Sequence, residues 1–134
     1  MKYIENENKF SWWKKVNINY KDFIIKTDQP IINGGEDTYP DPFSIFISSI
    51  GACAGFYILS FCQERGITTN DIELLLQTTK NKQTKLIEKI DITIFTQNFP
   101  DKYIKSMIKV ANLCTVKKHL ENPPQINVIF NKND

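Results

Sequence analysis

The first forty residues predict β structure. Segments 10–19 and 22–27 are short runs of mixed apolar and polar residues, joined at the polar tetrapeptide 19–22, which favours a β-hairpin. Gly34–Gly35 and three prolines at positions 30, 40 and 42 then interrupt the pattern. We therefore expect a loop over roughly residues 28–42.

Residues 43–63 contain no charged side chain and form the longest such run in the chain. The pattern predicts a helix that is buried on nearly all sides, with Gly66 as its C-terminal stop. A chain of 134 residues cannot cover such a helix by itself, so we expect an intimate dimer. The run is also long enough to span a bilayer, but its serines and glycines dilute its hydrophobicity and favour a soluble assembly.

The second half of the chain alternates strands and helices. Strands are predicted at 71–79 and 84–96 around a polar turn at 81–83, with Ile90, Ile92 and Ile94 on one face. Pro100–Asp101 opens a predicted helix, and a short helical turn follows at 115–121. A last strand is predicted from the alternation of Ile126, Val128 and Phe130. The pattern indicates one domain over residues 1–134, of the α+β class, with helices segregated from an antiparallel sheet.

Composition narrows the classes of function. The 17 basic residues, of which only Arg65 is an arginine, nearly balance 15 acidic ones, and this argues against a nucleic-acid partner. An aromatic-basic stretch at 12–15 is better explained as an edge strand with its lysines outside. Three cysteines are an odd number for a disulfide-stapled module, and the polar N-terminus is unlike a signal peptide. We therefore expect a cytoplasmic protein with reduced thiols.

Helix geometry separates the three thiols. Cys53 and Cys62 are nine residues apart, so on one helix they face opposite sides about 13 Å apart, too far for a disulfide. A working pair is therefore Cys53 with Cys114 or Cys62 with Cys114. We prefer Cys53, because it lies between Gly51 and Gly55, a patch that serves either tight helix packing or access of a reactant.

Cys114 has its own route to reactivity, because it precedes a predicted helix whose positive end favours a thiolate. Lys117 and Lys118, one turn further on, add positive charge. The alternative for each cysteine is a small buried apolar residue without chemistry.

Metal and phosphate sites are not expected. The chain has no CxxC motif, and Cys114 and His119 are about 140° apart around a helix, so they do not converge on a metal ion. Residues 33–36 contain two glycines but lack the lysine and the spacing of a phosphate-binding loop. We expect no cofactor.

Five stretches form a recognisable set of motifs: Thr27–Pro30, Gly34–Asp37, Asp41–Phe43, Ser49–Gly55 and Cys114–Pro124. Together they resemble the OsmC/Ohr family, the osmotically inducible and organic-hydroperoxide-resistance proteins. The resemblance covers about residues 24–130 and is closest to the broad OsmC-like branch. It implies an OsmC-like α+β fold in which two chains intertwine as a homodimer, with the central helices of both chains packed together.

The resemblance also implies an antioxidant, stress-response activity as a thiol peroxidase for organic hydroperoxides. In that scheme Cys53 attacks the O–O bond and becomes a sulfenic acid, and Cys114 condenses with it to a disulfide. An external dithiol reduces the disulfide, and Cys62 is structural. No membrane partner is implied.

The sequence departs from the peroxidase members at two places. Those members hold the first cysteine as thiolate with an arginine from the N-terminal strands, whereas here Lys14, Lys15 or Lys26 would have to replace it. The usual carboxylate after the helix-starting proline is also missing, and Glu36 or Asp41 would have to serve. A second hypothesis is therefore a non-enzymatic module on the same dimeric fold, which uses Phe43 and Phe46 to bind an acyl or aromatic ligand.

Overall fold

The computed structural model describes residues 4–5 and 14–132. The chain divides into two compact units, Met1–Ser49 and Ile50–Asp134, and the boundary falls within the long helix α1 (Pro42–Glu64). The single domain expected over residues 1–134 stays a prediction.

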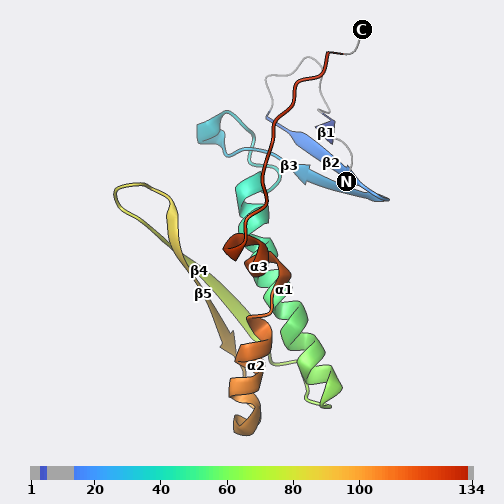
Figure 1. The fold of residues 1–134 in the computed structure, drawn as a ribbon, viewed down its shortest axis with the longest axis vertical. Coiled ribbons are helices and arrows are strands. Elements are labelled where there is room, and N and C mark those ends of the chain that lie inside the picture. Colours follow the sequence, from blue (N-terminus) through green and yellow to red (C-terminus); the bar gives the residue numbers. More distant parts are fainter. Residues whose placement is uncertain (1–3, 6–13, 133–134) are drawn as a thin grey trace. The chain divides into compact units, whose positions relative to one another are not determined.

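The first unit contains a three-stranded antiparallel sheet in the order β1–β2–β3 (Figure 1). Its strands are β1 (Ile4–Glu5), β2 (Val16–Tyr20) and β3 (Phe23–Thr27). The turn between β2 and β3 places Lys21 at φ 52°, and Tyr20 pairs with Phe23 across it. The predicted hairpin is therefore confirmed, while positions 10–13 of the first predicted strand lie outside the described residues.

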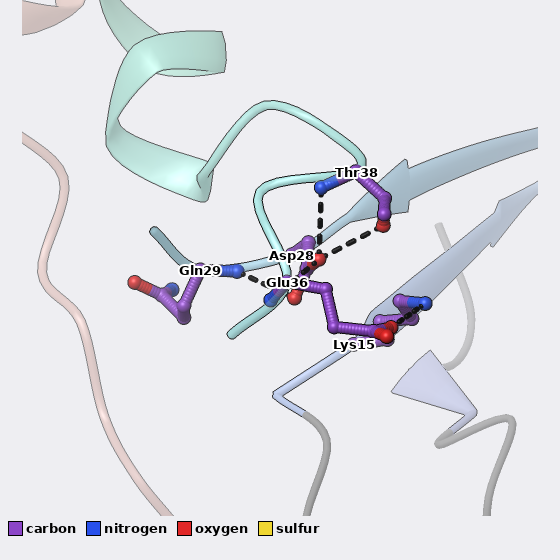
Figure 2. A network of polar contacts seen from close by, with 5 residues as sticks. All are labelled: Lys15, Asp28, Gln29, Glu36 and Thr38. Carbon is purple, nitrogen blue, oxygen red and sulfur yellow. Dashed lines mark hydrogen bonds and ion pairs between the residues drawn. The ribbon is translucent and has the colours of Figure 1, made fainter. Parts of the chain in front are cut away.

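The loop after β3 is organised by one buried carboxylate, which Figure 2 shows. Asp28 is fully buried and accepts hydrogen bonds from the backbone N–H groups of Gln29 (2.8 Å), Glu36 (3.2 Å) and Thr38 (3.1 Å). It also accepts one from the Thr38 hydroxyl at 2.9 Å. Burial by itself raises the pKa of Asp28, but these hydrogen bonds outweigh it and lower the pKa to about 2.

Gly35 completes this loop. A Cβ atom at position 35 would lie 1.9 Å from the Gln29 carbonyl oxygen and 2.8 Å from Oδ1 of Asp28, so only glycine fits. The loop also contains the short 3-10 helix η1 (Ile31–Asn33). Glu36 of this loop forms an ion pair with Lys15 (Figure 2).

Helix α1 begins and ends at residues whose chemistry explains both boundaries. The Asp41 carboxylate accepts hydrogen bonds from the backbone N–H groups of Phe43 (3.0 Å) and Ser44 (3.1 Å), as an N-capping residue does. At the other end, Gly66 adopts φ 63° and the Ile67 N–H donates to the Cys62 carbonyl oxygen at 2.9 Å. The predicted helix and its stop are confirmed.

Burial along α1 differs from the expectation. The buried residues form one stripe, Ile50, Ala54, Ile58, Phe61 and Cys62. Other apolar residues of the helix are exposed, Phe56 by 62% and Leu59 by 41%, because the described part of one chain does not cover them. By length and composition α1 could cross a membrane, with a mean hydropathy of 1.9 over a window that is 28% buried. The buried core helix of a soluble protein passes the same test of length and composition, so the test alone does not identify a membrane span.

The second unit contains a β-hairpin and two short helices after α1 (Figure 1). Strands β4 (Glu73–Lys80) and β5 (Ile87–Phe95) pair antiparallel, followed by the 3-10 helix η2 (Asp101–Tyr103) and the helices α2 (Ile104–Ala111) and α3 (Thr115–Glu121). On β5, Ile90, Ile92 and Ile94 are less exposed than their neighbours, as predicted. The core of the unit joins Ile58, Phe61 and Cys62 of α1 to Met107 of α2.

Two sequence expectations about strands are corrected. The single antiparallel sheet is instead a three-stranded and a two-stranded sheet. The last predicted strand does not form, since residues 123–132 are neither helix nor strand, and Ile126, Val128 and Phe130 are exposed by 84–98%. Alternation specifies which side chains share a face, but a strand also needs a paired edge, and no strand among the described residues pairs with this segment. The described residues form a mixed fold of small antiparallel sheets and three α-helices.

Candidate active site

The structure brings together two of the three cysteines, Cys53 and Cys114, both in the second unit. Cys53 lies within α1, and Cys114 directly precedes α3. The Cys114 side chain lowers the pKa of the Cys53 thiol and Cys53 raises the pKa of Cys114, so the two thiols lie close enough to interact. Of the two pairings that helix geometry left open, the structure therefore places Cys53 beside Cys114. Cys62 is fully buried in the core with Ile58, Phe61 and Met107.

The surroundings of Cys53 favour its thiolate. Burial raises the pKa of this thiol, but the backbone N–H of Val116, the thiol of Cys114 and the backbone N–H of Thr115 together lower it below its ordinary value. Both N–H groups belong to the first turn of α3, where the helix itself offers them no acceptor. Sequence reasoning missed Thr115 and Val116 because they act through the backbone; their position just after Cys114 was the one available indication.

Cys114 behaves differently from the expectation. It is the N-cap of α3, and its Sγ accepts a hydrogen bond from the Lys117 N–H at 3.4 Å, so the predicted place at the helix start is confirmed. Burial nevertheless raises the pKa of this thiol, the neighbouring Cys53 raises it further, and the N–H groups of Lys117 and Val116 do not offset them. The start of α3 thus favours a Cys114 thiolate as expected, but burial decides the direction of its pKa, and the same turn also lowers the pKa of Cys53.

Contacts between α1 and the start of α3 hold the two thiols in place. The Tyr57 hydroxyl lies 3.2 Å from the Thr115 hydroxyl, and the Cys114 Sγ lies 4.0 Å from the Ile50 carbonyl oxygen. The glycine patch contributes packing on another side of α1. A Cβ atom at Gly51 would lie 3.2 Å from Leu76, and one at Gly55 would lie 3.1 Å from Leu74. Leucines of β4 thus fill the space beside both glycines, which supports the packing explanation of this patch.

A pocket of about 730 Å³ opens beside Cys114. Its walls are largely aliphatic and come from α1, β5, α2 and α3, with Ile50, Ala54, Ile92, Ile108 and Ala111 among its lining residues. Cys114 belongs to the wall of this pocket, whereas Cys53 does not. The two thiols therefore have different surroundings: Cys114 borders an apolar space, and the half-buried Cys53 lies outside it.

The charged residues proposed as substitutes for the missing arginine and carboxylate all lie in the first unit. Lys15 pairs with Glu36, and Lys26 lies 5.5 Å from the centre of the Tyr39 ring. Asp41 caps α1, and hydrogen bonds from Ser44 lower its pKa. A role for any of them, or for Lys14, beside Cys53 stays a prediction.

The side chains that the ligand-binding hypothesis uses, Phe43 and Phe46, lie near each other on α1. Their ring centres are 5.6 Å apart, and both side chains are exposed. Within residues 4–5 and 14–132, no three His, Cys, Asp or Glu side chains gather in a way that could hold a metal ion.

Several solved structures share the fold of this chain. A candidate osmotic stress induced and detoxification response protein from Psychrobacter arcticus is 18% identical with a TM-score of 0.70, covering 87% of this chain and 84% of its own. A hypothetical protein from Aquifex aeolicus is 15% identical with a TM-score of 0.68, covering 90% and 86%. An OsmC-like protein from Mycoplasma pneumoniae is 17% identical with a TM-score of 0.61, covering 81% and 80%. At these identities the likeness establishes the fold alone.

Sequence comparison supplies the family. No curated protein matches the chain. The family model described as OsmC-like protein matches residues 34–129, which include both Cys53 and Cys114 and most of the chain. The resemblance seen in the sequence motifs is confirmed, and the chain belongs to the OsmC-like protein family.

Proposed function

We propose that this protein is a thiol-dependent peroxidase that reduces organic hydroperoxides with Cys53 as the attacking and Cys114 as the resolving cysteine. The observation that carries the proposal is the packing of the start of α3 on α1, through the Tyr57 and Thr115 hydroxyls, which brings Cys114 close enough to lower the pKa of the Cys53 thiol. A peroxidatic cysteine must be present as thiolate. The surroundings described above lower the pKa of Cys53 and raise that of Cys114, so they favour the thiolate at Cys53. Family membership supports the same chemistry.

The reaction has two steps on the protein. The Cys53 thiolate attacks one oxygen of the hydroperoxide, the O–O bond breaks, and the organic alcohol leaves with a proton while Cys53 becomes a sulfenic acid. The Cys114 sulfur then attacks the Cys53 sulfur, its proton and the sulfenic hydroxyl leave as water, and a disulfide forms. An external dithiol returns both cysteines to thiols.

The assembly that we propose is a homodimer in the cytoplasm. Large apolar side chains on α1 are exposed in the single chain, and Phe43 (55%), Phe56 (62%) and Leu59 (41%) are examples. A second copy packed on this helix would remove them from water, and burial of about 25 cal/mol per Å² of apolar surface would stabilise the pair. This arrangement would also place an otherwise exposed apolar helix inside a soluble particle.

The direct test is a non-reducing peptide map after one equivalent of cumene hydroperoxide. We expect a Cys53–Cys114 disulfide in the wild-type protein and in Cys62→Ser, which serves as the matched control because Cys62 lies in the core. The disulfide should be absent in Cys53→Ser. If both thiols stay reduced while the protein remains folded by circular dichroism, the peroxidase proposal is wrong.

A second function is favoured by the pocket. Its volume of about 730 Å³ and its aliphatic walls suit an acyl or aromatic ligand, which a non-enzymatic protein of this fold could carry. Native mass spectrometry of the purified protein would detect such a ligand. A stoichiometric apolar ligand together with thiols that do not react with hydroperoxide would replace the peroxidase proposal with this one.

A further inference from the structure

Three residues, Asn112–Cys114, connect α2 to α3, and a chain of hydrogen bonds spans this connection. The Asn112 side chain donates through Nδ2 to the Ile108 carbonyl oxygen at 2.8 Å, which fixes it to the last turn of α2. Its Oδ1 accepts a hydrogen bond from Nζ of Lys117 at 2.6 Å. The backbone N–H of the same lysine donates to Sγ of Cys114 at 3.4 Å. Lys117 therefore links the Asn112 side chain to the Cys114 sulfur.

We propose that Asn112 is a positioning residue for the resolving step, which holds the Cys114 sulfur, through Lys117, in the place from which it attacks Cys53. This inference rests on the proposed function, because it assigns a residue to the second step of the same cycle. An attack within one molecule is fast only when the reacting atoms are held close to the geometry of the reaction. A side chain that fixes the connection therefore acts on the rate of that step.

The bond between Lys117 and Asn112 is the stronger of the restraints on this connection. It is short and its donor is charged, whereas the Cys114 Sγ lies 4.0 Å from the Ile50 carbonyl oxygen, which is a long contact. The Lys117 ammonium also lies 3.9 Å from Oε1 of Glu121. Both members of that pair belong to α3, so it does not span the connection.

The rate of the resolving step decides what happens to an oxidised Cys53. When Cys114 attacks in time, the sulfenic hydroxyl leaves as water and a disulfide forms. When it does not, a second hydroperoxide molecule transfers an oxygen atom to the sulfenic acid and leaves as the alcohol, and the product is a sulfinic acid. Asn112 would thus protect Cys53 from oxidation that a thiol does not reverse.

The rate at which Cys114 attacks can be measured without hydroperoxide. Dithiodipyridine reacts first with the half-buried Cys53 rather than with Cys114, which is 2% exposed. The Cys53 thiolate attacks the reagent and releases one pyridinethione, so that Cys53 carries a mixed disulfide. The Cys114 sulfur then attacks the Cys53 sulfur, and a second pyridinethione leaves. This second release is independent of reagent concentration, and its absorbance gives the rate of ring closure.

Variants at both ends of the hydrogen bond test the proposal. We expect Asn112→Ala to slow the second release about threefold, a modest effect because the Lys117 side chain is 45% exposed. Lys117→Met keeps the backbone N–H to Cys114 and should slow it equally. The double variant should be no slower than either single variant, because both remove one interaction. Glu121→Gln is the matched control, since it removes the other partner of Lys117, and its rate should equal that of the wild type.

Asn112→Asp separates positioning from a merely structural role. It keeps the acceptor for Lys117 but loses the donor to Ile108, so it should destabilise the protein in urea unfolding as Asn112→Ala does, yet close the ring at the wild-type rate. The proposal is overturned if Asn112→Asp closes the ring as slowly as Asn112→Ala, or if Lys117→Met closes it at the wild-type rate. A wild-type protein that closes the ring with dithiodipyridine but forms no disulfide with cumene hydroperoxide would refute the proposed function and leave the positioning role in place.

Discussion

Thr115→Pro tests whether the backbone of α3 activates Cys53. Thr115 is the first residue of α3, a position that accepts proline because its N–H has no partner within the helix. The preceding residue, Cys114, has φ −44° and ψ 122°, a conformation that a following proline tolerates. The substitution therefore removes one N–H donor to Cys53 and leaves the helix in place.

The magnitude follows from the strength of that hydrogen bond. A net hydrogen bond to a charged group contributes about 1.5–3 kcal/mol, and the low end applies because Cys53 is only half-buried. Losing about 1.4 kcal/mol reduces the thiolate fraction about tenfold below the pKa. The more basic thiolate is about threefold more nucleophilic, so the observed rate near neutral pH falls only about threefold. On the plateau at high pH the variant should instead react about threefold faster.

The assay is the pH dependence of iodoacetamide alkylation at Cys53, followed by mass spectrometry. Thr115→Ala is the matched control, because it removes the hydroxyl that lies 3.2 Å from Tyr57 but keeps the N–H. Its profile should follow the wild type. The reasoning is refuted if the two variants give the same profile, or if the proline variant does not cross the wild-type profile.

Three further predictions concern stability and assembly. Gly35→Ala should lower the free energy of unfolding by about 3 kcal/mol in urea, because its Cβ would lie 1.9 Å from backbone. Gly66→Ala has open space around its Cβ and should lower it by about 1 kcal/mol. Equal losses in the two variants would contradict the steric explanation. Asp28 has a depressed pKa of about 2, so its contribution to stability is full above about pH 4 and is lost as the pH falls toward 2. Asp28→Asn should therefore flatten the dependence of the unfolding free energy on pH between about 4 and 2. An unchanged dependence would exclude this carboxylate as its cause. Phe56→Asp should shift the protein from dimer to monomer in light scattering, and a wild-type monomer would refute the proposed assembly.

The elements that the sequence predicts well depend on local patterns. The hairpin around Lys21 follows from the alternation of apolar and polar residues. The helix from Pro42 to Glu64 follows from its lack of charged residues, and its end follows from Gly66, which adopts a positive φ. The place of Cys114 beside a helix start was predictable from the short helical turn at 115–121, which the prolines at 123 and 124 end. The segment around Val128 shows the limit, because alternation cannot supply the edge that a strand must pair with.

The parts of the site that escaped prediction are tertiary. Periodicity separated Cys53 from Cys62 but could not choose the partner of Cys114, which depends on how α3 meets α1. The sequence showed that the helix start favours a Cys114 thiolate, but it could not show that burial raises the pKa of Cys114 by more than the N–H groups lower it. The buried hydrogen-bond set of Asp28 also lay beyond sequence patterns, since its donors are backbone groups up to ten residues away.

The N-cap of α3 links the covalent state of the protein to its local dynamics. The Cys114 sulfur accepts the Lys117 N–H, so the group that begins the helix is also the group that would enter a disulfide. In a disulfide the position of this sulfur is fixed by its new partner and no longer by the Lys117 N–H. Oxidation would therefore loosen the first turn of α3. Hydrogen exchange at the single amide of Lys117 would then report the redox state of the cysteine pair.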